Sequence, residues 1–129
     1  MKKLASLLLS ALLAFSALPV LAQGGGVVNV FNWEDYINED VIAMFEEETG
    51  IKVNYMRFTL NEDMMVQVRT SPGAFDVVFP SDYAIERMIA EDLLQPIDFA
   101  KVPNAENTLD WLKNPDYDPE NRYSVPYMW

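Results

Sequence analysis

The stretch "VVNVFNWEDYINEDVIAMFEEETGIKVNYMRF" (residues 27–58) decides the fold class, because it holds one complete strand–helix–strand unit. Its first six residues form a short apolar run that is typical of a strand. Asn38 predicts a helix cap before an acidic first turn, and Gly50 predicts the end of a helix over 39–49. The alternating residues 51–58 predict a second strand, and this order favours a parallel pair with a right-handed crossover.

The same order of elements continues downstream. Asn61 is predicted to cap a helix over 62–71, and the nearly continuous apolar run at 75–80 predicts a third strand covered on both faces. Ser81 is predicted to cap a third helix over 82–94. Each helix carries an apolar stripe that is expected to face the core: Val41, Ile42, Met44 and Phe45; Met64, Met65 and Val68; Ile85, Met88 and Ile89.

These units predict an α/β fold with a parallel sheet in the order 2-1-3 and helices on both faces. Beyond the third helix we expect loops and a short helix through 93–112, turns at 114–121 and the start of another strand at 122–129. Because the chain ends in an apolar, aromatic segment, we interpret it as a fragment whose fold is incomplete at the C-terminus.

The first 22 residues have the pattern of a secretory signal peptide, with a basic "MKK", a long apolar stretch and small residues before the predicted cleavage site. We expect cleavage between Ala22 and Gln23, residues 23–27 as a flexible leader, and export to the periplasm without stable membrane insertion. The alternative is an uncleaved membrane anchor, because the apolar stretch is close to the length that spans a bilayer.

The composition argues against several classes of protein. The chain has no cysteine and no histidine, so disulfides, thiolate nucleophiles and most transition-metal sites are excluded, and no metal or cofactor is expected. The net charge of −11 becomes −13 without Lys2 and Lys3, and no basic patch is available for nucleic acid. The motifs of nucleophile elbows, phosphate-binding loops and dinucleotide sites are missing as well.

A ligand site is predicted by the topology. In an open parallel sheet, ligands bind beyond the carboxyl ends of the strands, where the strand order reverses. For the order 2-1-3 this point lies between the first and third strands. The segments "NWEDY" (32–36) and "PSDY" (80–83) follow those strands, and each places an aromatic ring beside a carboxylate.

The residue types at this rim favour an organic cation such as a polyamine. The rings of Trp33, Tyr36 and Tyr83 can attract ammonium groups and sandwich methylenes. Asp35 and Asp82 can supply charge-assisted hydrogen bonds. Two alternatives stay open: rings that only cover the edge of the core, and an aspartate at 82 that only stabilises the first turn of a helix.

A site for an oxyanion is the opposite interpretation of the same rim. Ser81 and the backbone amides at a helix N-terminus suit an anion. Such a site would not normally be lined by Glu34, Asp35 and Asp82, so these carboxylates favour the cation.

Five motifs carry a family resemblance: "FNWEDYI", "FEEETGIKV", "NEDMMVQV", "FDVVFPSDYAIERM" and "YSVPYMW". On them, the chain from Val28 to Trp129 resembles the spermidine/putrescine-binding proteins of bacterial ABC transporters. The resemblance implies a type II periplasmic-binding-protein fold, in which two α/β lobes close on a ligand that is then delivered to a permease. It makes residues 28–129 the N-terminal part of lobe 1, with lobe 2 absent.

The resemblance also implies roles for individual residues. Trp33 and Tyr36 match aromatics that pack on the methylenes of the polyamine, and Asp35 matches an acid that pairs with an amino group. Ser81 and Tyr83 match contacts in the loop after the third strand. Glu34 departs from the family, where a small hydroxyl residue is often found.

Several functional alternatives remain beside the polyamine-binding component of a transporter. One is a binding protein for another organic cation, and another is a truncated product that binds no ligand of its own. A third is an exported enzyme using Glu34 and Asp35 as acid and base, although sequence neighbours rarely converge on one bond. Because the family's other ligand contacts are absent, we expect the chain alone to bind polyamines in the millimolar range or not at all.

Overall fold

The computed structural model describes residues 25–128, and the predicted signal peptide at 1–22 lies outside them. Strands and α-helices alternate along the first part of this range: β1 (Gly26–Trp33), α1 (Glu39–Thr49), β2 (Ile51–Phe58), α2 (Asn61–Thr70), β3 (Val77–Val78) and α3 (Asp82–Ala90). Three short 3-10 helices follow: η1 (Phe99–Lys101), η2 (Pro103–Asn107) and η3 (Asp110–Leu112).

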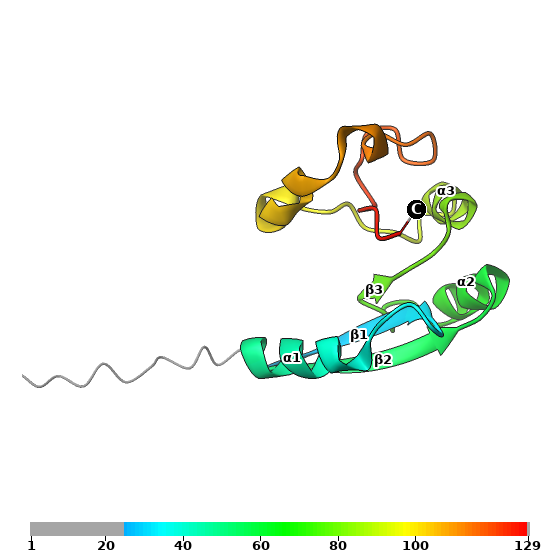
Figure 1. Cartoon of the computed structure of the whole chain (residues 1–129). Helices are drawn as coiled ribbons and strands as arrows, with labels where there is room; N and C mark the ends of the chain where they lie inside the picture. Colours follow the sequence, from blue (N-terminus) through cyan, green and yellow to red (C-terminus); the bar gives the residue numbers. More distant parts are fainter. Residues whose placement is uncertain (1–24, 129) are drawn as a thin grey trace, which may run out of the picture.

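The sheet has the order β2-β1-β3 with all pairs parallel, which confirms the predicted α/β fold and its 2-1-3 topology (Figure 1). β1 is central and pairs with β2 along its whole length, from Gly26 opposite Ile51 to Trp33 opposite Phe58. In Figure 1 the segment after α3 lies beyond β3, on the side of the sheet away from β2.

Helices cover both faces of the sheet. On one face, Phe31 and Phe58 meet edge to face at 5.0 Å and pack with α2 and α3 in the core cluster, whose other buried members are Met64, Met65, Ala84 and Met88. Successive strand residues point to opposite faces, so Arg57 lies on the other one. There Arg57 forms an ion pair with Glu39 of α1, which places that helix on the second face.

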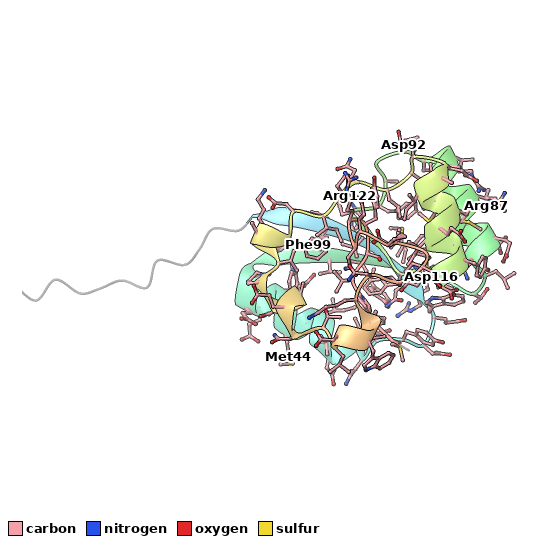
Figure 2. The ribbon with its side chains drawn as sticks, turned by 90° about the horizontal axis from the view of Figure 1, so that it is seen from above. Met44, Arg87, Asp92, Phe99, Asp116 and Arg122 are labelled. Carbon is pink, nitrogen blue, oxygen red and sulfur yellow. The ribbon has the colours of Figure 1, made fainter. Side chains whose placement is uncertain are left out.

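The predicted ends of α1 are confirmed, but the prediction that its apolar stripe faces the core is wrong. Asn38 accepts a hydrogen bond from the Asp40 amide, and Gly50 ends the helix with a left-handed φ of 71°. Met44 is nevertheless 65% exposed and lies at the periphery of the molecule (Figure 2). The helix is held to β2 through Glu46, which accepts from the backbone amide of Val53 at 2.8 Å, rather than through the stripe. Val41 and Phe45 are exposed as well.

The third strand is shorter than the predicted 75–80, and one of its faces is open. At Asp76 the backbone amide still donates to the Asn29 carbonyl at 2.9 Å, but the Asn29 amide donates to the Asp76 carboxylate at 2.7 Å instead of to a backbone carbonyl of the third strand. Val77 is 43% exposed, so the expectation of a strand covered on both faces is wrong. The Phe79 amide still donates to the Phe31 carbonyl at 3.0 Å and prolongs the parallel pairing by one bond.

The capping predictions for α2 and α3 need correction. α2 begins at Asn61, whose side chain binds a distant loop instead of capping the helix. Ser81 does precede α3, but its hydroxyl makes no capping hydrogen bond. α3 ends at Ala90 rather than at 94, because Asp92 takes a positive φ of 55° and turns the chain. The predicted inward stripes are confirmed, since Met64, Met65, Ile85 and Met88 are buried.

The C-terminal segment contains 3-10 helices where one short helix was expected, and residues 122–128 form no strand. The physical reason lies in Asp118, whose carboxylate accepts the backbone amides of Arg122, Tyr123 and Ser124 at 2.9–3.0 Å. Donors that a strand would offer to a neighbour are used inside this turn. Within residues 25–128, no helix is long and apolar enough to cross a bilayer.

Candidate functional site

An aromatic wall stands at the carboxyl end of the central strand. Trp33 is the last residue of β1, and its ring packs on Phe58 of the core at a centroid distance of 4.6 Å. Tyr36, on the turn that follows, places its ring 5.9 Å from that of Trp33 at an angle of 36°. Tyr36 remains 47% exposed, so the pair presents an open aromatic surface that is supported from beneath by the core.

The turn after β1 carries two exposed acids, Glu34 and Asp35. Asp35 is exposed beside the aromatic pair. The backbone amide of Glu34 donates to the Phe58 carbonyl at 3.2 Å, which ties the turn to β2. The side chain of Glu34 lines a separate pocket of 230 Å³ together with Arg57, Asp63 and Gln67. Glu34 thus borders this pocket, and Asp35 lies exposed on the turn between Trp33 and Tyr36.

Tyr127 connects this wall to the third strand. Its hydroxyl donates to the backbone carbonyl of Tyr36, and its ring meets Phe79 edge to face at 4.6 Å. The sequence analysis did not select Tyr127 as a site residue. The signal that pointed to it was the aromatic ending "YSVPYMW", which was used only for the family resemblance.

The loop between β3 and α3 carries the other predicted residues. Ser81 Oγ and the Tyr83 hydroxyl each accept a hydrogen bond from the Asn61 side chain at 3.0 Å. The Tyr83 hydroxyl in turn donates to Glu62 at 3.1 Å, while its ring is half exposed. The Asp82 carboxylate accepts from the Tyr83 amide at 2.7 Å, as expected for an acid in the first turn of a helix.

Two groups of predicted residues thus lie on neighbouring loops at one edge of the sheet, as the topology predicted. Trp33, Asp35 and Tyr36 share the loop after β1, and Ser81 to Tyr83 share the loop after β3. Among residues 25–128 no hydrogen bond or ring contact joins the two groups directly. Their connection runs through Phe79 and Tyr127.

Polar groups near the wall were missed by the sequence analysis. Asn32 is fully buried, and its Oδ1 accepts from the Trp33 amide at 2.7 Å, while Nδ2 has no partner among the described residues. The hydroxyl of Tyr55 is also buried and makes no hydrogen bond of normal geometry within residues 25–128; burial raises its pKa, and the nearby Asn32 side chain opposes that rise. Burial raises the pKa of Tyr117, and the negative charges of Asp82 and Asp118 raise it further, so this tyrosine lies near the β3–α3 loop.

The arrangement suits a cation that has apolar parts. Aromatic faces attract ammonium groups electrostatically, and an exposed carboxylate adds a charge-assisted hydrogen bond. No cluster of three metal-ligating side chains occurs in the part of the chain that the structure describes. The groups that these loops present are aromatic rings and carboxylates.

Comparison with known proteins identifies relatives of this chain. The spermidine/putrescine-binding periplasmic proteins of Salmonella typhimurium LT2 and Escherichia coli K12 are each 37% identical to this chain over 131 residues, covering all of it and 38% of their own length. The putrescine-binding periplasmic protein PotF of Escherichia coli K12 is 38% identical over 130 residues, covering 99% of this chain and 35% of its own length.

Solved structures give the same result for the fold. The spermidine/putrescine ABC transporter substrate-binding protein PotD of Streptococcus pneumoniae superposes with a TM-score of 0.77 at 38% identity, covering 79% of this chain and 32% of that protein. The TpPotD lipoprotein of Treponema pallidum gives a TM-score of 0.71 at 33% identity, again covering 79% and 32%.

The chain spans less than two fifths of the length of these relatives. The sequence profile described as bacterial extracellular solute-binding protein matches residues 40–129, which is more than half of the chain. That family and these relatives are solute-binding proteins and not enzymes. The chain belongs to the family of bacterial extracellular solute-binding proteins.

Proposed function

We propose that this chain is part of the solute-binding component of a polyamine ABC transporter, which captures spermidine or putrescine in the periplasm and delivers it to the permease. The observation that carries the proposal is the wall of Trp33 and Tyr36, whose rings lie 5.9 Å apart with the exposed Asp35 between them in sequence. Relatives named for spermidine and putrescine support this choice of ligand.

The chemistry of the wall matches the alternating character of a polyamine. Methylene segments pack on ring faces, and the ammonium groups between them are attracted by the same rings and by Asp35. The net charge of −11 attracts polycations over a longer range. In this proposal, Ser81 and Tyr83 add contacts from the neighbouring loop, and Asp82 and Glu34 act at its border.

The proposal assigns residues 1–22 to a cleaved signal peptide and 28–129 to the N-terminal part of the first of two lobes. A ligand held by one wall alone binds weakly. Micromolar affinity requires about 8 kcal/mol, and a few ring contacts with a half-exposed carboxylate supply about half of that. Of the two outcomes expected from the sequence, millimolar binding or none, the proposal takes the first, because the aromatic wall is present, and we expect the 129-residue chain alone to bind spermidine with a millimolar dissociation constant.

A titration followed by NMR tests the proposal. Spermidine and putrescine are added to the protein while the indole NH signals of the three tryptophans are observed. We expect saturable shifts of the Trp33 indole NH that are weakened in Asp35→Asn. In Trp33→Leu, which lacks this indole, we expect the ligand-dependent shifts of the backbone amides in the same loop to be lost. Glu47→Gln, which removes the charge of an exposed acid near the C-terminal end of α1, is the matched control and retains the shifts.

Magnesium chloride at the same ionic strength separates recognition from general attraction to an acidic protein. The proposal is contradicted when magnesium reproduces the spermidine shifts, or when spermidine shifts are spread over the surface and do not saturate at Trp33. Arginine and choline extend the panel, and saturation by one of them in preference to both polyamines would identify a binding protein for another organic cation.

A further inference from the structure

Asn61 is a buried amide that binds a loop distant in sequence. It is the first residue of α2, and its side chain is only 4% exposed. Its Oδ1 accepts from the backbone amide of Ser81 at 3.2 Å, and its Nδ2 donates to Ser81 Oγ and to the Tyr83 hydroxyl, both at 3.0 Å. Both donor hydrogens of the amide and its acceptor are thereby used.

The start of α2, which carries Asn61, is anchored in the core. One turn further along α2, Met64 and Met65 are buried in the core cluster, which fixes the start of the helix relative to the sheet. Burial of an amide is unfavourable unless its hydrogen bonds are made. An asparagine capping its own helix would satisfy them locally, but this side chain meets a loop 20 residues away.

We infer that Asn61 is a positioning residue for the proposed cation site, because it holds Ser81 and Tyr83 of the β3–α3 loop against the start of α2. This inference rests on the proposed function and extends it. In this arrangement the ring of Tyr83, and not its hydroxyl, is the part that meets the ligand. The Tyr83 hydroxyl accepts from Asn61 and donates to Glu62, so the half-exposed ring is the part left for a cation.

The local half of the inference is tested by hydrogen exchange without any ligand. Asn61→Leu removes all three bonds. Asn61→Asp retains an acceptor for the Ser81 amide, and for the Ser81 hydroxyl once that group turns to donate, but it loses the bond to the Tyr83 hydroxyl, whose proton is used on Glu62. We expect fast exchange of the Ser81 amide in Asn61→Leu and protection close to wild type in Asn61→Asp. The amides of the β1–β2 ladder are the internal reference, and Asn54→Asp, which alters an exposed side-chain amide pair on the sheet, is the control.

The functional half is tested by spermidine titration of the same variants and of Tyr83→Phe. Asn61→Asp is expected to weaken spermidine binding roughly tenfold, the factor that about one buried hydrogen bond represents. If Asn61 acts through Tyr83, the double variant Asn61→Asp/Tyr83→Phe loses no more than the larger single loss, so the two effects are not additive. Asn61→Gln keeps an amide on a longer side chain. It is expected to bind spermidine more tightly than Asn61→Leu if its NH2 group still reaches the β3–α3 loop.

Three outcomes overturn the inference. One is unchanged exchange at Ser81 in Asn61→Leu, and another is exchange that rises equally in the β1–β2 ladder, which marks a purely global loss of stability. The third is additive losses in the double variant. If wild-type protein binds no spermidine, the proposed function fails and the role of Asn61 in that site fails with it, while the exchange of the Ser81 amide still decides whether the tether exists.

Discussion

Asp118 illustrates how one side chain organises the C-terminal segment. It is 2% exposed, and its carboxylate accepts hydrogen bonds from the backbone amides of three residues and from Ser124 Oγ. Burial raises the pKa of this carboxyl, but the donors from Tyr123, Arg122 and Ser124 lower it by more, so the pKa lies below its ordinary value. The folded protein therefore favours the ionised form.

This pKa shift predicts a dependence of stability on pH. A carboxyl whose pKa is lower in the folded state contributes its full stability above the pKa of the unfolded chain, about 3.9, and loses it as the pH falls through the folded value. Asp118→Asn should lower the free energy of unfolding at pH 7 by about 2–4 kcal/mol, because an amide accepts at one oxygen only. Urea unfolding measures the loss.

The matched control for this prediction is Asp116→Asn, on the same turn but exposed, which should change stability by less than about 0.5 kcal/mol. The difference between wild type and Asp118→Asn should shrink as the pH is lowered toward the folded pKa. A difference that stays constant from pH 7 to acid would show that the charge of Asp118 is not what stabilises the turn.

At the scale of elements, an ion-pair network joins the ends of α2 and α3. Glu91, just after α3, binds Arg69 of α2 at 2.8 Å and Arg87 of α3 at 3.0 Å. The hydrogen bond from Arg69, followed by that from Arg87, lowers the pKa of Glu91 to about 2. Stability from this network is present at neutral pH and is lost as the pH falls from 4.5 through about 2.

Glu91→Gln should therefore lower the melting temperature at pH 7, and its melting curve should converge with that of wild type near pH 2. Differential scanning calorimetry across this range checks the prediction. Glu86→Gln removes an exposed acid of the same helix and serves as the control, with a melting temperature close to wild type at every pH. A gap between Glu91→Gln and wild type that persists at pH 2 would contradict the assigned pKa.

The apolar residues of α1 and α2 are expected to contribute differently to the free energy of unfolding. A methionine-to-alanine substitution in each helix measures the difference. Met64 of α2 is fully buried, whereas Met44 of α1 is 65% exposed (Figure 2). Met64→Ala should cost about 2–5 kcal/mol, and Met44→Ala less than about 0.5 kcal/mol. Equal losses in urea unfolding would mean that the stripe of α1 is covered in the protein in solution.

The elements that sequence predicts well are those whose ends depend on nearby residues. The limits of α1 follow from Asn38 and Gly50, whose capping contacts lie within a few positions. The alternating residues 51–58 predict a strand, and β2 has the same limits. Asn61 has the residue type and position of a cap but binds a loop 20 residues away. Nothing in the local sequence distinguishes these two asparagines, because the difference is tertiary.

At the scale of the whole molecule, the negative charge should make polyamine binding depend on salt. The net charge of −11 acts over the Debye length, which shrinks from about 30 Å at 0.01 M to about 10 Å at 0.1 M salt. Spermidine carries one more positive charge than putrescine, so its dissociation constant should rise more steeply with sodium chloride. NMR titrations at both salt concentrations measure the two slopes.

Binding through the aromatic rings should depend on salt less than binding through the carboxylate. Asp35→Asn should flatten the salt dependence of spermidine binding, while Trp33→Leu should weaken binding at both salt concentrations by a similar factor, because contacts with a ring are less sensitive to screening. Equal salt slopes for spermidine and putrescine would argue that local contacts, and not the charge of the whole molecule, set the affinity.

The sequence predicted the location of the candidate site in the fold, but only some of the residues that form it. Parallel topology brings the ends of β1 and β3 to one edge, and the predicted residues lie on those two loops. The contacts of Asn61 and Tyr127 with these loops could not be predicted from local sequence, because they join residues 20 and 91 positions apart. Whether these residues bind a polyamine stays a prediction.

The contact between Tyr127 and Tyr36 also has a consequence in time. The chain is made from its N-terminus, so the loop of Trp33 and Tyr36 leaves the ribosome well before Tyr127 exists. At the usual rate of about 5–20 residues per second, the 91 positions between the two tyrosines correspond to about 5–18 s of synthesis. Throughout that interval the nascent chain carries the loop of Trp33 and Tyr36 without the tyrosine that later binds it.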